Sequence, residues 1–228
     1  MKNAVRMLST LGLLGAMRSL SSAFETATGV HIDADFAPTQ ALLQRLRGGE
    51  VADLVILTRE GLDEVIAEGL VAAETVADLA RSYVGIAVKA GRAHPDISTE
   101  SALRETLRGA RSVAYSRLGA SGIFFTRLIE QLGIAAEINA RAIVVQQGLT
   151  AERLLADEAD LAVQQISELK QVDGIEIVGP VPRELQVPVL FSAGRMASAS
   201  NAAAADRLLR YLASSEVGFV LRQSGLEP

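Results

Sequence analysis

Apolar positions along this chain alternate between two spacings, one typical of strands and one typical of helices. Residues 5–10 form a short run rich in β-forming side chains. From residue 13 onward the apolar side chains recur every third or fourth residue, at Leu13, Leu14, Met17, Leu20 and Phe24. Gly29 follows the last turn, where glycine suits the C-terminal cap of a helix. The segment therefore predicts a strand followed by an amphipathic helix.

The same alternation continues to the C-terminus. Further strands are predicted at residues 30–36, 52–57, 83–88, 112–115, 142–145, 161–164 and 187–191. Further helices are predicted at residues 39–48, 60–68, 100–107, 123–132, 150–156, 202–213 and 216–223. Strands that alternate with helices predict an α/β fold with mostly parallel sheets and helices on both faces.

Residues 5–24 have a second interpretation, as a secretory signal. Lys2 and Arg6 precede the apolar run, and Ser21-Ser22-Ala23 resembles a small-residue cleavage site. However, the helical stripe continues in phase across this point, because Leu20 and Phe24 lie on the same predicted face. We therefore expect the segment to belong to the folded protein and the chain as it stands to be cytoplasmic. The alternative is a periplasmic protein with a misassigned start or a cleaved N-terminus.

Composition excludes several classes of protein. The 228 residues carry a net charge of −5 without a basic cluster, which argues against a nucleic-acid surface. No apolar run reaches the 18 or so residues needed to span a bilayer, so we expect no membrane insertion. The chain has no cysteine and only two histidines, far apart in sequence. We therefore expect neither a metal site nor a cofactor.

Four predicted strand-to-helix junctions are unusually small and polar. In a parallel α/β sheet, ligands bind at the carboxyl ends of strands, next to the N-termini of the following helices. Backbone N–H groups at such N-termini favour anions. The four junctions are Ser9-Thr10-Leu11-Gly12, Ala37-Pro38-Thr39-Gln40, Gly119-Ala120-Ser121-Gly122 and Gln146-Gln147-Gly148. Since they are divided between the two halves of the chain, they predict a polar site for a small anionic ligand.

Several segments resemble bacterial molybdate-binding proteins in order and spacing, over essentially the whole chain. Residues 24–30 are similar to their A-F-E-x-x-T-G-V stretch, and residues 35–42 lie where they have F-G-S-S-G-A-L. Residues 49–54 resemble G-x-x-A-D-V, and residues 119–124 match P-A-G-I-Y. Residues 148–162 resemble the stretch that ends E-A-D-x-G, and residues 217–228 resemble the closing helix and its G-x-x-P tail.

The resemblance implies a type II periplasmic-binding-protein fold, with two α/β lobes joined by two crossing strands that act as a hinge. The first lobe would comprise residues 1–82 and 192–228, and the second residues 83–191. The implied function is that of a solute-binding protein that closes its lobes over a small anion for ABC transport. The anion would be a molybdate-like oxyanion or a small organic carboxylate. The implied partner is an ABC permease if the protein is exported, and we expect a monomer.

The resemblance also implies ligand-binding residues, with departures from the family pattern. The first oxyanion-binding serine of the family falls at Gly12, close to Ser9 and Thr10, and the second falls at Thr39. The alanine whose backbone N–H binds the oxyanion becomes Ser121, and the tyrosine that covers the oxyanion falls near Gln165. These changes put molybdate itself in doubt.

Four more residues complete the candidate binding set. Gly122 and Gln147 lie in the polar turns, and Arg59 and Arg117 follow predicted strands. Arginine binds planar carboxylates as well as tetrahedral anions. The alternative for both arginines is a solvated side chain on the surface.

An enzyme on the same fold is the alternative function, because aconitate isomerase resembles this same family. An allylic proton shift on a tricarboxylate needs carboxylate clamps and a general base. Arg59, Arg117, Thr39 and Ser121 could serve as clamps, and Glu60 or Tyr115 could carry the proton. For Glu60 the alternative role is a helix-start charge, and for Tyr115 it is a core phenol. We favour the binding protein, because the residues indicate a binding geometry and do not require catalysis.

Overall fold

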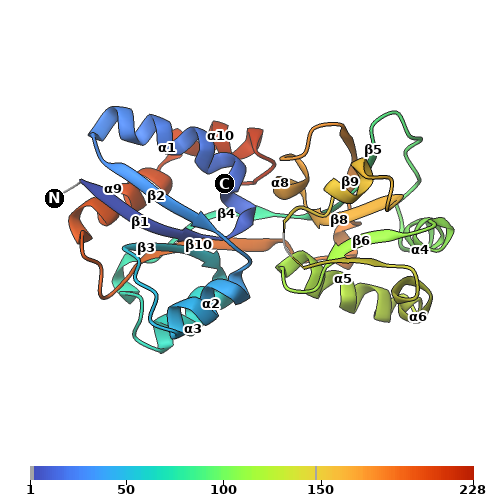
Figure 1. The fold of residues 1–228 in the computed structure, drawn as a ribbon, viewed down its shortest axis with the longest axis horizontal. Helices are drawn as coiled ribbons and strands as arrows, with labels where there is room; N and C mark the ends of the chain where they lie inside the picture. The colour runs from blue at the N-terminus through green and yellow to red at the C-terminus, as the bar shows by residue number, and fades with distance from the viewer. Residues whose placement is uncertain (1–2, 147) are drawn as a thin grey trace. The chain divides into compact units, whose positions relative to one another are not determined.

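The computed structural model describes residues 3–146 and 148–228, which divide into two compact units (Figure 1). Lobe 1 consists of the described residues of 1–82 and 189–228, and lobe 2 of those of 83–188. The second boundary lies three residues before the predicted one, because strand β10 (Val189–Arg195) pairs with strands of lobe 1 from its first residue onward.

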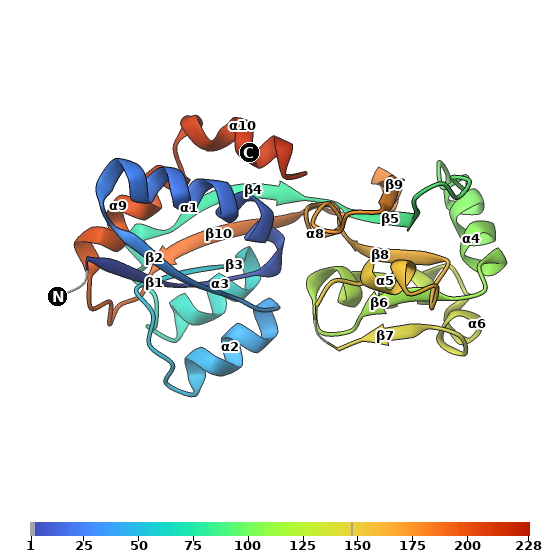
Figure 2. The same cartoon turned by 45° about the horizontal axis from the view of Figure 1, so that its top comes forward.

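The described residues of lobe 1 form a five-stranded sheet in the order β2-β1-β3-β10-β4 (Figure 2). The strands are β1 (Ala4–Ser9), β2 (His31–Phe36), β3 (Leu54–Thr58), β4 (Ala77–Ser82) and β10. One face packs against α1 (Leu14–Thr28), α9 (Ala202–Leu212) and α10 (Gly218–Gln223). The other face packs against α2 (Thr39–Arg47) and α3 (Arg59–Ala67). The central strand β3 is buried over its whole length, as a strand covered on both faces must be.

Lobe 2 repeats this arrangement with a second five-stranded sheet, β7-β6-β8-β5-β9, in its described part. Its strands are β5 (Val84–Lys89), β6 (Val113–Ser116), β7 (Ile143–Val145), β8 (Leu161–Gln165) and β9 (Ile175–Pro180). One face packs against α4 (Glu100–Gly109), α5 (Ala120–Gln131) and α6 (Ala135–Asn139). The short helices α7 (Glu152–Leu155) and α8 (Ile166–Leu169) pack on the opposite face.

The α/β class is confirmed, but the sheets are mixed rather than mostly parallel. In lobe 1, β1 pairs in parallel with β2 and β3, whereas β10 is antiparallel to β3 and β4. In lobe 2, β6 pairs in parallel with β7 and β8, whereas β5 is antiparallel to β8 and β9. The hydrophobic pattern missed β4, β9, α6 and α8. It also placed β10 at residues 187–191 and began α5 at residue 123, three residues after its observed start.

The N-terminal segment is part of the core of lobe 1. β1 lies between β2 and β3 in the sheet. The apolar side chains of this segment are buried, including those of Val5, Met7, Met17, Leu20 and Phe24. Residues 5–24 therefore supply a central strand and its covering helix, and the cellular compartment stays a prediction. None of the described helices is both long and apolar enough to cross a membrane.

Helix α5 begins directly over the end of β6, with a very close approach at Gly122. An ideal Cβ atom on Gly122 would lie only 1.2 Å from the carbonyl oxygen of Ser116. No side chain fits there, because the obstacle is backbone rather than the end of a flexible side chain. Glycine is therefore required at position 122 for packing. This requirement is independent of any contact between Ser121 and a ligand.

We predict that Gly122→Ala lowers the free energy of unfolding by about 2 kcal/mol or more, because the methyl group overpacks the turn. Gly119→Ala is the matched control in the same turn. Its Cβ would meet no atom closer than 3.9 Å, and its φ of −83° suits alanine. We expect that control to change stability by less than about 1 kcal/mol. Urea denaturation measures both, and equal effects would contradict the packing argument.

Candidate functional site

The candidate residues of lobe 1 lie at the carboxyl ends of its parallel strands. Ser9 and Thr10 end β1 and are 0% and 5% exposed. The Ser9 hydroxyl donates a hydrogen bond to the carbonyl of Thr10 at 3.2 Å, and the Thr10 N–H donates to the carbonyl of Ile56 at 2.9 Å. Part of their hydrogen-bonding capacity therefore stabilises the turn itself.

Gly12 stands where the family resemblance places a ligand-binding serine, and the structure gives a packing reason for glycine. An ideal Cβ on Gly12 would lie 2.4 Å from Cζ of Phe191, a fully buried ring on β10. A serine side chain would collide with this ring. Gly12 therefore has backbone groups alone to offer a ligand.

Thr39 begins α2 and is 6% exposed. Its hydroxyl oxygen accepts a hydrogen bond from the N–H of Thr58 at 3.2 Å, which links the end of β3 to the start of α2. A threonine hydroxyl that accepts one hydrogen bond still has its own proton to donate. This geometry suits the predicted role of Thr39 as a hydroxyl donor at the ligand end of the sheet.

Arg59 and Glu60 begin α3, and both are more exposed than the other candidates of lobe 1. Arg59 Nε donates to Asp63 at 2.9 Å, and Nη1 donates to Asp78 at 3.2 Å. These two carboxylates raise the pKa of Arg59 above its ordinary value. Because Asp63 and Asp78 already compensate its charge, a ligand would have to compete with them for Arg59. Glu60 is exposed in the first turn of α3.

Lobe 2 presents two serine hydroxyls at the junction of β6 and α5. Ser116 is 8% exposed and Ser121 is 3% exposed. An ideal Cβ on Gly119 would lie 3.9 Å from Ser116 Oγ and 4.0 Å from Ser121 Oγ, so both hydroxyls flank this glycine. The Ser116 hydroxyl accepts from the N–H groups of Leu118 and Gly119 at 3.3 and 3.4 Å. The Ser116 hydroxyl therefore holds the turn, and Ser121 is the residue at which the resemblance places a ligand-binding backbone N–H, with a hydroxyl in addition.

Tyr115 is a core phenol with an engaged hydroxyl. It is 0% exposed, and its hydroxyl donates to Asn139 Oδ1 at 2.7 Å. Arg117 is exposed and donates from Nε to the Tyr115 hydroxyl and from Nη2 to Asn139 Oδ1, both at 3.4 Å. No described carboxylate forms an ion pair with Arg117. In contrast to Arg59, this guanidinium has an uncompensated charge within the described residues.

A chain of buried polar side chains lies at the carboxyl end of β8. Gln164 Oε1 accepts from the N–H of Thr150 at 2.8 Å and from its hydroxyl at 3.0 Å. The side-chain amide of Gln164 in turn donates to the carboxylate of Glu168 in α8. Gln164 is 3% exposed and Thr150 is 0% exposed. Gln147, a predicted ligand residue before this turn, lies outside the described residues.

Gln165 differs from its neighbours because its side chain is buried without partners. It is 1% exposed, and neither its amide nitrogen nor its amide oxygen has a hydrogen-bond partner among the described residues. A buried amide without partners is costly, so it points to a group that completes the site. Gln165 also lies near the position where the resemblance places a ligand-covering tyrosine.

Glu168 is the acidic residue of this cluster. It lies one helical turn after Gln165, and its carboxylate accepts hydrogen bonds from the Gln165 N–H and from the Gln164 side chain. Burial raises the pKa of Glu168 to about 7, and the two hydrogen bonds only partly oppose this effect. The causes of the shift are burial and these two hydrogen bonds, and no charged group of the described residues is among them. Glu168 therefore gains or loses a proton near neutral pH.

Sequence reasoning proposed Gln165 and Ser121 but missed Thr150, Gln164 and Glu168. The available signal was the spacing of Gln165 and Glu168, since a glutamate at the third helical position commonly hydrogen-bonds the N-cap N–H. This spacing is informative only if a helix is known to begin at Ile166. Helix α8 has four residues, too few to show a hydrophobic period in the sequence. Because α8 was not predicted, the role of Glu168 was not predicted either.

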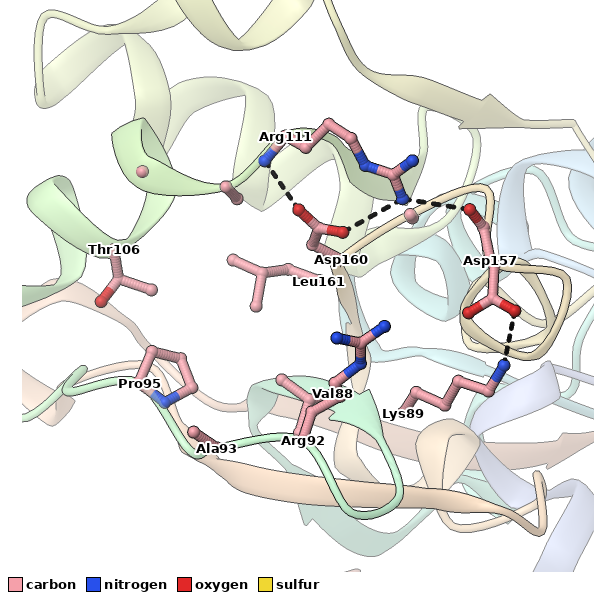
Figure 3. A pocket seen from close by; sticks show the side chains of 13 residues that line it. Val88, Lys89, Arg92, Ala93, Pro95, Thr106, Arg111, Asp157, Asp160 and Leu161 are labelled. Carbon is pink, nitrogen blue, oxygen red and sulfur yellow. Dashed lines mark hydrogen bonds and ion pairs between the residues drawn. The ribbon is translucent and has the colours of Figure 1, made fainter.

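Lobe 2 also contains a cavity of about 520 Å³ away from these residues (Figure 3). It lies where β6 and β8 begin, at the opposite end of those strands from Ser116 and Gln165. Two ion pairs line it, Lys89 with Asp157 at 2.7 Å and Arg111 with Asp160 at 3.1 Å. None of the described ligand candidates lines this cavity, so it is separate from the predicted site.

Comparison with known proteins gives a consistent family and fold. Residues 5–227 match the family described as bacterial extracellular solute-binding protein. The chain is 37% identical over 227 residues to a protein named aconitate isomerase from Pseudomonas sp, covering 97% of this chain and 86% of that protein.

Two solved structures share the fold at low sequence identity. The periplasmic molybdate-binding protein of Azotobacter vinelandii has a TM-score of 0.83 at 15% identity, covering 98% of this chain and 99% of that chain. The sulfate-binding protein SubI of Mycobacterium tuberculosis has a TM-score of 0.76 at 15% identity, covering 99% and 87%. At this identity the likeness concerns the fold alone.

The raised pKa of Glu168 predicts a pH-dependent stability. Between its ordinary value of 4.5 and about 7, the folded state binds more protons than the unfolded state, so stability falls as pH rises. A shift of this size corresponds to about 3 kcal/mol. We expect the difference in unfolding free energy between wild type and Glu168→Gln to fall by up to this amount from pH 4.5 to 8. The exposed Glu130→Gln serves as the control for removal of a carboxylate at the surface. A constant difference for Glu168→Gln would contradict the burial argument.

Proposed function

The chain belongs to the family of bacterial extracellular solute-binding proteins, and we propose that it binds a small polycarboxylate anion in preference to a metal oxyanion. The observation that carries the proposal is the full-length relative that is 37% identical and named for aconitate, a tricarboxylate. The cited oxyanion-binding structures are only 15% identical.

The donor set is compatible with the same ligand class. Gln165 offers an amide in place of the phenol that the resemblance leads us to expect, and both of its polar atoms lack partners among the described residues. Arg117 adds a guanidinium without a carboxylate partner in the described part of the chain. Guanidinium groups bind planar carboxylates through two parallel hydrogen bonds, and they bind tetrahedral anions in the same way, so Arg117 suits an anion of either class.

Transport is the function that the family supports first. In this role the protein would bind the polycarboxylate and deliver it to an ABC permease, and we expect it to do so as a monomer. A permease partner requires a location outside the cytoplasm, and a cytoplasmic location would exclude it. Fractionation of the native host, with immunodetection of the chain, separates the two locations.

Isomerisation of the bound carboxylate is the second candidate. Two observations favour it, namely the name of the 37% identical relative and the buried carboxyl of Glu168 beside Gln165. A binding protein needs no group that changes its protonation near neutral pH. An isomerase that shifts an allylic proton does need one.

A thermal-shift panel tests the ligand class. At about a thousand times its Kd, a ligand stabilises the folded state by about 4 kcal/mol, which for a chain of this size raises Tm by about 10 °C. We expect this shift with cis- or trans-aconitate or citrate, and none with molybdate, tungstate, sulfate or phosphate. Gln165→Leu should reduce the shift because it removes both amide atoms, while the exposed Glu130→Gln should keep it. A shift with molybdate and tungstate alone would overturn the carboxylate proposal.

A further inference from the structure

Glu168 combines three features that a purely structural carboxylate does not need. It is 8% exposed, it lies at the carboxyl end of a strand that runs parallel to β6, and it is one turn from the unpartnered amide of Gln165. The two hydrogen bonds named above, from Gln164 and from the Gln165 N–H, are fewer than the about four that a carboxylate can accept. The Glu168 carboxylate, a proton acceptor, therefore lies one helical turn from the buried Gln165 amide, which has no hydrogen-bond partner among the described residues.

Among the residues that the structure describes, no charged neighbour fixes the protonation state of Glu168. Helix α8 packs against β5, β8 and β9. The charged residues of these strands are Lys89, which pairs with Asp157 at 2.7 Å, and Glu176, which contacts His94 Nε2 at 2.8 Å. The remaining charged residue next to Glu168 is Lys170, at the C-cap of α8. None of these groups contributes to the environment that sets the protonation of Glu168.

We propose that Glu168 is the proton-transfer group for the allylic isomerisation of an unsaturated tricarboxylate bound at the end of β8. The inference rests on the proposed carboxylate site and adds the catalytic group. Neither earlier candidate fits as well, because Glu60 is an exposed helix-start residue and the Tyr115 hydroxyl already donates to Asn139.

The reaction balances without a cofactor. The Glu168 carboxylate takes a proton from the methylene carbon of the substrate and becomes a neutral carboxylic acid. The electrons of the broken C–H bond form the new C=C bond, and the former double bond moves its electrons to the former vinyl carbon. That carbon receives the proton back from Glu168, which regenerates the carboxylate. The product has the same constitution as the substrate, with the double bond shifted and its cis or trans geometry open to change.

The other role of Glu168 is that of a helix cap, and one substitution separates the two roles. Glutamine also caps at the third helical position, because its amide oxygen accepts from the same N–H. Glu168→Gln thus keeps the cap and the volume but removes the proton acceptor. Glu168→Asp keeps the acid and moves it back by one methylene group.

The experiment measures binding and turnover on the same proteins. Calorimetry with trans-aconitate gives Kd, and proton NMR follows conversion between trans- and cis-aconitate. We expect Glu168→Gln to bind within about threefold of wild type while its kcat falls by at least about 100-fold, the usual range for loss of a general base. Glu168→Asp should recover part of the rate, and Glu130→Gln should match wild type. The wild-type kcat/KM should rise with pH and level off above about pH 7.

The outcomes distinguish this inference from the proposed function. Turnover by Glu168→Gln within about threefold of wild type would overturn the inference and leave Glu168 as a cap. Binding of aconitate by wild type without any turnover would also overturn it, but the carboxylate-binding function would stand. Failure of wild type to bind any tricarboxylate would overturn both. Loss of folding in Glu168→Gln would be detected by its Tm, and in that case Glu168→Asp and the pH profile would decide.

Discussion

The polar chemistry of this protein depends on the requirement that buried polar side chains find hydrogen-bond partners. At the end of β8 this requirement is met by a short chain of interactions. Thr150 donates to Gln164, and Gln164 donates to Glu168. These contacts fix the orientation of three segments at once, namely the turn before α7, the end of β8 and the start of α8. Because its neighbours are satisfied by one another, the amide of Gln165 is left without a described partner.

In lobe 1, the buried carboxylate of Asp53 also finds hydrogen-bond partners. Asp53 is 3% exposed and accepts hydrogen bonds from the N–H groups of Arg6 and Asn201 and from the hydroxyl of Ser200. Burial would raise the pKa of Asp53, but these donors hold it below its usual range. The carboxylate thereby joins β1, β3 and the start of α9, which are far apart in sequence. At Asp53 the donors outweigh the effect of burial on the pKa, whereas at Glu168 burial outweighs the donors.

The hydrophobic pattern predicted the elements that have a strong period or a fully apolar run. It found β1, β3, α1 and α9, because each buries a regular stripe or a continuous core segment. It missed β4 (Ala77–Ser82), an edge strand in which Asp78 and Arg81 interrupt the apolar positions. It missed β9 as well, another edge strand, whose last residue is a proline and whose residues are at most partly buried.

The candidate site was predictable to the extent that it depends on turns and on the family pattern. Small polar turns indicated Thr39 and Ser121, and the resemblance indicated Gln165. Three-dimensional packing decided the rest. The ring of Phe191 explains glycine at position 12, Asp63 and Asp78 engage Arg59, and the core encloses Tyr115. Phe191, Asp78 and the core around Tyr115 involve residues distant in the chain, so local sequence carried no sign of them, whereas Asp63 lies only four residues after Arg59 and was a local signal.

The carboxyl of Glu168 also distinguishes the two candidate functions in physical terms. For a receptor, a carboxylate close to an anion is unfavourable, because like charges repel and both must lose water. A site that only binds an anion gains more from a hydroxyl or an amide at this position, and glutamine would cap α8 equally well. An acid that is close to half protonated at neutral pH reduces this repulsion and can still exchange a proton with a ligand. On the proposal that a carboxylate ligand binds beside it, Glu168 would lower the affinity for the anion while supplying a proton acceptor, a combination that an isomerase requires and a receptor does not.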